Sequence, residues 1–83
     1  MKDFAHFLLT HIVDNPDSVS IDESVDDRGT ILLIIHVEQS DIGKVIGKEG
    51  RTINAIRDVI KVKAIKENKY VEITVAEQWR YPS

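Results

Sequence analysis

The spacing of hydrophobic residues changes several times along this 83-residue chain, and each change predicts a new structural element. Over residues 2–14 these residues recur every three or four positions, which predicts an amphipathic helix that ends at Asn15-Pro16. Over residues 19–25 they alternate with polar residues, which predicts a strand with one face in water. The aliphatic run at 31–37 predicts a central strand buried on both faces, and the two strands are expected to pair as a hairpin.

The second half of the chain predicts two further helices. Ser40 or Asp41 can cap a short helix that ends at Ile46. A longer helix is expected from about residue 51 to residue 66, because apolar residues again recur at helical spacing. Asn68 is a suitable left-handed C-cap for that helix.

The last alternating segment, residues 71–75, predicts a final strand. The fold class is therefore α+β, in the order helix, strand, strand, helix, helix, strand. We expect residues 1–75 to form one domain, because a chain of this length suffices for one small core. Residues 76–83 show no periodicity and are expected to form a mobile tail.

The segment between the two later helices contains the most informative motif. Gly47-Lys48-Glu49-Gly50 places two charged residues between two glycines, and aliphatic residues lie on both sides. The glycines permit a sharp turn and leave room for a sugar-phosphate backbone, while the start of the next helix favours an anion. We therefore predict a nucleic-acid site, in which glycines and cations hold phosphates and aliphatic side chains form the floor under the bases.

The far wall of this site is expected at the edge of the long strand near Ile35 and Val37, and polar side chains such as Asn54 and Arg57 would add base selectivity. The residues that we assign to the site are Ile42, Gly43, Lys44, Val45, Ile46, Gly47, Lys48, Glu49, Gly50, Arg51, Ile53, Asn54 and Arg57.

The charge distribution supports this prediction although the formal net charge is −3. Residues 1–42 carry nine acidic and two basic side chains, whereas residues 43–69 carry eight basic and three acidic ones. The basic charge is therefore concentrated where a phosphate backbone would lie. A solvated helix face is the alternative explanation of such a cluster.

The motif, the element order and the Asp14-Asn15-Pro16 segment together resemble a type II KH domain, and in particular the small bacterial single-KH proteins of the KhpA type. This resemblance implies a three-stranded sheet packed against three helices on one face. It also implies binding of about four nucleotides of single-stranded RNA at the GXXG loop. The implied role is post-transcriptional regulation or RNA chaperoning, with a link to cell growth or division. Glu49 departs from the neutral or basic residues usual at its position, so we expect RNA binding that is weaker but not lost. Its charge could equally stabilise the N-terminus of the next helix.

Other kinds of site fit the sequence less well. Only three residues separate Gly43 from Gly47, whereas a phosphate-binding P-loop needs four before its Gly-Lys pair. His6 and His11 would not face each other on a helix, and His36 lies in a strand, so we expect no metal, cofactor or catalysis. The remaining alternative is a helix–turn–helix corner whose glycines serve packing only.

The long helix carries two apolar stripes. We expect Ile53, Ile56, Ile60 and Ala64 to pack on the sheet. The second stripe, which we call the outer stripe, consists of Ala55, Val59 and Val62. It predicts a partner surface, either in a homodimer or, as the resemblance implies, with a larger KH-containing protein. One wide core-facing arc that includes both stripes is the alternative.

Composition limits the setting in which the protein acts. The sequence contains no cysteine, which excludes disulfides and fits a reducing cytoplasm. It has neither an apolar run of membrane-spanning length nor a signal peptide, so we expect a cytoplasmic protein without membrane or small-molecule partners. Trp79 and Tyr81 could stack on bases, or pack the tail against the sheet.

Overall fold

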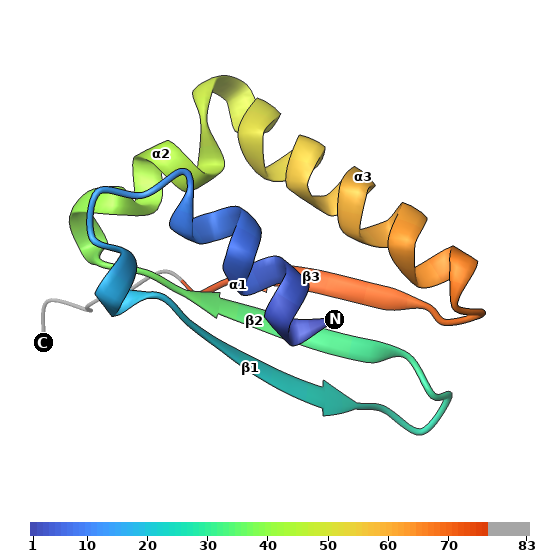
Figure 1. Ribbon diagram of the computed structural model, residues 1–83. Coiled ribbons are helices and arrows are strands. Elements are labelled where there is room, and N and C mark those ends of the chain that lie inside the picture. The colour runs from blue at the N-terminus through green and yellow to red at the C-terminus, as the bar shows by residue number, and fades with distance from the viewer. Residues whose placement is uncertain (77–83) are drawn as a thin grey trace, which may run out of the picture.

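Three helices cover one face of a three-stranded sheet in the computed structural model, which describes residues 1–76 (Figure 1). This is the α+β architecture and the element order that the sequence predicts. The elements are α1 (Lys2–Thr10), β1 (Ser20–Val25), β2 (Ile31–His36), α2 (Ile42–Ile46), α3 (Arg51–Lys66) and β3 (Val71–Val75). Short 3₁₀ turns lie at Pro16–Ser18, Gln39–Asp41 and Lys48–Gly50.

The sheet is mixed and has the order β1-β2-β3. β1 and β2 form the expected antiparallel hairpin, whereas β2 and β3 are parallel. A parallel neighbour requires a crossover connection, and α2 and α3 provide it on the covered face of the sheet. Because β2 is central, β1 and β3 are the two edge strands of the sheet that residues 1–76 form, and α3 packs against β3.

The hydrophobic core lies between the sheet and the helices. The covered face of β2 contributes Ile31, Leu33 and Ile35, of which Leu33 and Ile35 are at most 1% exposed. The prediction that this strand is buried on both faces was wrong. Ile34 points to the other face and is 38% exposed, because the helices cover only one side of the sheet.

α1 is shorter than the periodicity predicts. It ends at Thr10, and the backbone N–H groups of Ile12 and Val13 both donate to the carbonyl of Leu9 in a tightened last turn. The backbone is therefore no longer α-helical when it reaches the Asn15-Pro16 pair. Its next backbone donors bind a side chain on a distant segment, which is described with the site below.

α3 begins and ends where the sequence predicts, at Arg51 and Lys66. Asn68 adopts the left-handed conformation with a φ of 60°, and the N–H of Lys69 returns to the carbonyl of Ala64 at 2.9 Å. None of the helices within residues 1–76 has both the length and the apolar character needed to cross a membrane.

Candidate nucleic-acid interface

The loop between α2 and α3 has a backbone that only glycine adopts easily at its two ends. Gly47 has φ and ψ of 76° and 175°, and Gly50 has 77° and 13°. Glu49 is also left-handed, with a φ of 56°, which is uncommon for a residue with a side chain. The turn is closed by the N–H of Gly50, which donates to the carbonyl of Gly47 at 3.2 Å.

The two glycines differ in the space around them. A Cβ on Gly47 would lie 2.3 Å from Oγ1 and 2.7 Å from Cβ of Thr52. A Cβ on Gly50 would approach nothing closer than Nδ2 of Asn54 at 3.9 Å. Gly47 is therefore required by packing against α3, whereas Gly50 leaves open space above the start of that helix. The explanation by packing alone accounts for the first glycine and not for the second.

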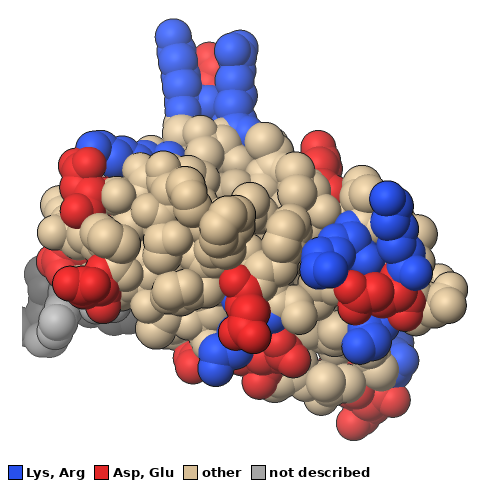
Figure 2. Space-filling view, in the orientation of Figure 1, with Lys and Arg blue, Asp and Glu red and all other residues tan. Residues whose placement is uncertain are grey.

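Basic side chains extend from this loop into solvent. Lys48 and Arg51 are exposed, and within residues 1–76 neither has an acidic side chain within 4 Å. Figure 2 shows basic side chains that project from the α2–α3 loop at the top of the view, with an acidic side chain between them. These cations are thus available to an anion, and Glu49 is the exposed acidic residue of the loop.

Lys44 differs from Lys48 and Arg51 because it already has an acidic partner. Its Nζ forms an ion pair with the Asp14 carboxylate, at the end of the segment that follows α1. The hydrogen bond to Asp14 raises the pKa of the Lys44 amine above its ordinary value, although partial burial acts the other way. A phosphate at this position would therefore have to compete with Asp14.

The opposite end of α2 is held by a buried carboxylate. Asp41 is 1% exposed and accepts the backbone N–H groups of Asp14 at 3.1 Å and Asn15 at 3.0 Å, and the Asn15 side-chain amide at 3.0 Å. Burial by itself would raise the pKa of this carboxyl, but these hydrogen bonds and nearby Lys44 lower it below its ordinary value of 3.8. Every buried side-chain nitrogen or oxygen in the described chain has a partner.

Ser40 or Asp41 was expected to cap α2, and Asp41 does occupy the N-cap position. Its side chain makes no capping bond, however, and instead joins the start of α2 to the segment that follows α1. The partners lie 26 and 27 residues away in sequence, so no local pattern could reveal them. The Asn15-Pro16 pair gave only the indirect signal that the first helix had to end.

The aliphatic residues expected in the floor lie at two depths. Val45 is fully buried and Ile53 is 4% exposed, so both belong to the core and support the surface from below. Ile42 and Ile46 are partly buried and pack against the same core. These two side chains of α2 are the ones that a base could touch.

The far wall was expected at Ile35 and Val37, and the structure corrects this expectation. β2 is central and paired on both sides, and both residues are buried. Of the two edge strands in the described part of the chain, β3 is the one that α3 packs against. Arg57 on α3 donates through Nε to the carbonyl of Ile73 on this edge at 3.3 Å, and through a terminal nitrogen to Asn54 at 3.3 Å.

This arrangement can be compared with known proteins. The family model of the KhpA/KhpB KH domain matches residues 2–75 of this chain. The chain belongs to the KhpA/KhpB KH-domain family. It is 41% identical over 75 residues to the RNA-binding protein KhpA of Clostridium perfringens, with 90% of this chain and 99% of the relative covered. It is 43% identical over 77 residues to the RNA-binding protein KhpA of Chlamydia caviae, with 93% and 97% covered.

Membership of the KhpA/KhpB family confirms the resemblance that the GXXG motif and element order indicate. The segment that carries the KhpA/KhpB match includes the loop, the buried Asp41 and the edge strand β3. Trp79 and Tyr81, together with most of the expected tail, lie outside the described residues.

The outer stripe of this KhpA/KhpB domain is exposed. Ala55 is exposed, and Val59 and Val62 are 47% and 55% exposed. The alternative of a single core-facing arc is therefore wrong, because the sheet contacts only one side of α3. Ile65 is 65% exposed on the same helix, and Phe7 is 58% exposed on α1; the sequence analysis assigned neither to a surface.

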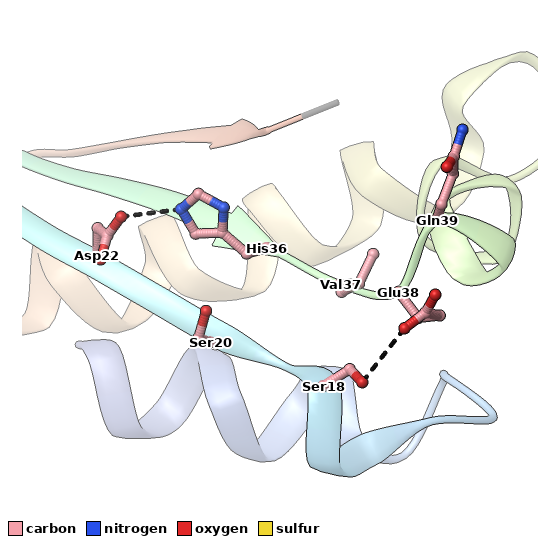
Figure 3. Close-up of a pocket in the computed structure, with 7 residues that line it drawn as sticks. All are labelled: Ser18, Ser20, Asp22, His36, Val37, Glu38 and Gln39. Carbon is pink, nitrogen blue, oxygen red and sulfur yellow. Dashed lines mark hydrogen bonds and ion pairs between the residues drawn. The ribbon is translucent and has the colours of Figure 1, made fainter. Parts of the chain in front are cut away.

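A shallow hollow of about 570 Å³ lies where β1 and β2 meet the following loop of this KhpA/KhpB domain (Figure 3). His36 Nε2 and Asp22 Oδ2 are 2.8 Å apart there, and Ser20 lies beside them. Within residues 1–76 no hydrogen bond joins the Ser20 hydroxyl to the imidazole, so the three groups do not form a proton relay. No group of three or more potential metal ligands occurs in the described chain.

Proposed function

We propose that this chain binds single-stranded RNA, with the Gly47–Gly50 loop against the sugar-phosphate backbone. The observation that carries the proposal is the open backbone of the loop next to two exposed cations without acidic partners in the described chain, Lys48 and Arg51. The names of the relatives, which are called RNA-binding proteins, support the same conclusion.

Each part of the site then has a role. The α3 N-terminus and the exposed cations attract phosphates, and Ile42 and Ile46 offer apolar contact to bases. Asn54 and the β3 edge offer hydrogen-bonding groups, while Arg57 is already engaged with Ile73 and positions the helix against that edge. No step of this function requires catalysis, a metal or a cofactor.

The test is the affinity of labelled single-stranded RNA pools for wild type and for the double variant Lys48→Asp, Glu49→Asp, measured by fluorescence anisotropy at two salt concentrations. We expect the variant to lose binding while its circular dichroism spectrum and melting temperature stay close to wild type. Wild-type affinity should fall by roughly 0.7 log unit per phosphate contact for each tenfold rise in salt.

Lys2→Asp is the matched control, because it changes charge by the same amount at the exposed start of α1, where an acidic residue is tolerated. Equal loss of affinity in the control would mean that overall charge, and not the loop, governs binding. Absence of wild-type binding at tens of micromolar would contradict the proposed function.

A second proposal concerns assembly, and the exposed outer stripe favours it. One KH groove reads about four nucleotides, which is too few to define a target by itself. We propose that Ala55, Val59 and Val62 pair with a second copy or with a larger KH-containing protein, so that two grooves act together. The setting we propose is the cytoplasm, and the role is post-transcriptional regulation or RNA chaperoning. A protein-interaction adaptor of KH fold, with weak or no RNA affinity, is the alternative that this surface permits.

Val59→Glu tests the assembly surface. A charged residue in the middle of a buried interface should shift the protein to a folded monomer, as measured by light scattering after size-exclusion chromatography. Asp58→Asn is the control and should leave the assembly unchanged, because Asp58 is also exposed and directly precedes Val59 on α3. A wild-type protein that is already monomeric at high concentration would exclude the homodimer and leave the heteromeric partner as the remaining possibility.

A further inference from the structure

A second basic surface lies at the end of α3 that is remote from the GXXG loop. It is a hollow of about 530 Å³ between the last turns of α3, the start of β3 and the β1–β2 turn. Arg28, Lys61, Lys69 and Tyr70 line it, together with the single carboxylate of Glu72. We call this hollow the distal pocket.

The side chains of the distal pocket suit a nucleic acid. Tyr70 is 76% exposed, which is unusual for a large aromatic residue beside a folded core. Its backbone is fixed, because the Tyr70 carbonyl accepts the N–H of Ile31 at 2.8 Å. Within residues 1–76, none of the three cations has an acidic partner within 4 Å. An exposed ring among cations can stack a base while the cations hold its phosphates.

One flank of α3 leads from the GXXG loop to the distal pocket. Asn54, Arg57 and Lys61 recur at three- and four-residue spacing, so they share this flank, and Arg57 reaches the β3 edge at Ile73. Lys61 lies ten positions after Arg51 on the same helix, a rise of about 15 Å. A short extended strand can therefore reach both ends of the flank.

We propose that RNA held at the GXXG loop continues along this flank and stacks a base on Tyr70, with phosphates at Lys61, Lys69 and Arg28. The footprint on one chain is then longer than the four nucleotides of the loop site. This inference rests on the proposed function, and it predicts that affinity depends on RNA length through the distal pocket. Glu72 opposes phosphate there and is outnumbered by the three cations.

The experiment compares labelled random-sequence RNAs of four and ten nucleotides by fluorescence anisotropy. We expect Tyr70→Ser to bind the ten-mer at least about five-fold more weakly than wild type and the four-mer equally well. Tyr70→Phe keeps the stacking surface and should behave as wild type at both lengths. The pair Lys61→Gln, Lys69→Gln should lower the salt slope for the ten-mer by about 1.4, and leave the four-mer slope unchanged.

A longer RNA offers more binding registers and so binds every variant a few-fold more tightly. Comparing wild type and variant on RNA of the same length removes this statistical gain. Lys66→Gln is the matched control, because Lys66 is exposed on the same helix end but does not line the distal pocket. Unchanged ten-mer affinity in Tyr70→Ser and in the lysine pair would overturn the distal pocket while the loop site stands. A wild type that binds neither RNA would overturn both proposals.

Discussion

The two ends of α2 differ in what their charged groups contact. At its start, the buried carboxylate of Asp41 uses its oxygens on three donors from the Asp14-Asn15 segment. At its end, the Gly47–Gly50 loop exposes cations that have no acidic partner in the described chain. A five-residue helix is too short to be stable by itself, so its position depends on the anchored end. The open end can then keep its charges for a ligand.

Lys44 lies between these ends and shares features of both. Its amine pairs with Asp14, and the charge of Asp41 supports the same protonated state. Charged groups that are already paired, such as Asp41 and Lys44, thus lie within a few residues of the exposed Lys48. The comparison predicts that changes at the anchored end act on folding, whereas side-chain changes at the open end act mainly on the proposed RNA binding. The exceptions are Gly47 and Gly50, because their positive φ angles make any substitution affect folding as well.

Gly47→Ala should have the largest effect on stability. The new Cβ would approach Thr52 to less than 3 Å, at a φ and ψ that are nearly exclusive to glycine. We expect the free energy of unfolding to fall by about 2–5 kcal/mol. Gly50→Ala meets no close atom and should cost only about 1–2 kcal/mol for its left-handed backbone. Urea denaturation followed by circular dichroism measures both.

The pair of alanine variants also separates folding from binding at the loop. Gly50→Ala places a methyl group in the open space above α3 and should weaken RNA binding more than its stability loss explains. Equal stability losses in the two variants would show that Thr52 does not constrain the loop.

Asp41→Asn should have the second largest effect. The amide carries donors where the carboxylate accepts three hydrogen bonds, so we expect the melting temperature at pH 7 to fall by roughly 5–15 °C. Because the folded-state pKa of Asp41 is lowered, its stabilisation is complete above the ordinary value of 3.8 and is lost as the pH falls through the lowered value. The difference between wild type and variant should therefore shrink in strong acid.

Asp14→Asn is the control for this prediction, because it removes a neighbouring carboxylate whose side chain is 69% exposed. Loss of such an exposed ion pair should change stability by less than about 1 kcal/mol. Similar melting temperatures for Asp41→Asn and Asp14→Asn would mean that the buried carboxylate does not anchor α2.

The same comparison explains what could be predicted from the sequence. The bounds of α3 follow from local information, namely a helical repeat of apolar residues, a glycine before Arg51 and a left-handed Asn68 after Lys66. The loop at the open end of α2 can also be predicted from local information, because its motif occupies four consecutive residues. Both could therefore be derived without coordinates, and so could the element order.

The errors concern contacts between distant segments. The segment after α1 is held by Asp41, which lies about thirty residues beyond Thr10, whereas periodicity alone extends that helix to residue 14. The exposure of Ile34 depends on which face of the sheet the helices cover, and an aliphatic run carries no information about that. β2 could not supply the expected far wall because it is the central strand, and strand order is a tertiary property.

Glu49 allows the smallest and sharpest test of the open end. Its left-handed backbone is a strain that glycine relieves, and its charge lies among the cations expected to meet phosphate. We expect Glu49→Gln to change stability by less than about 0.5 kcal/mol, and Glu49→Gly to raise it by less than about 1 kcal/mol, since relieved strain is partly offset by a more flexible unfolded chain. Both variants should bind RNA a few-fold more tightly by anisotropy, because both remove the same repulsion. A gain confined to Glu49→Gly would assign the effect to loop conformation, and a gain in neither would place Glu49 away from the phosphate path.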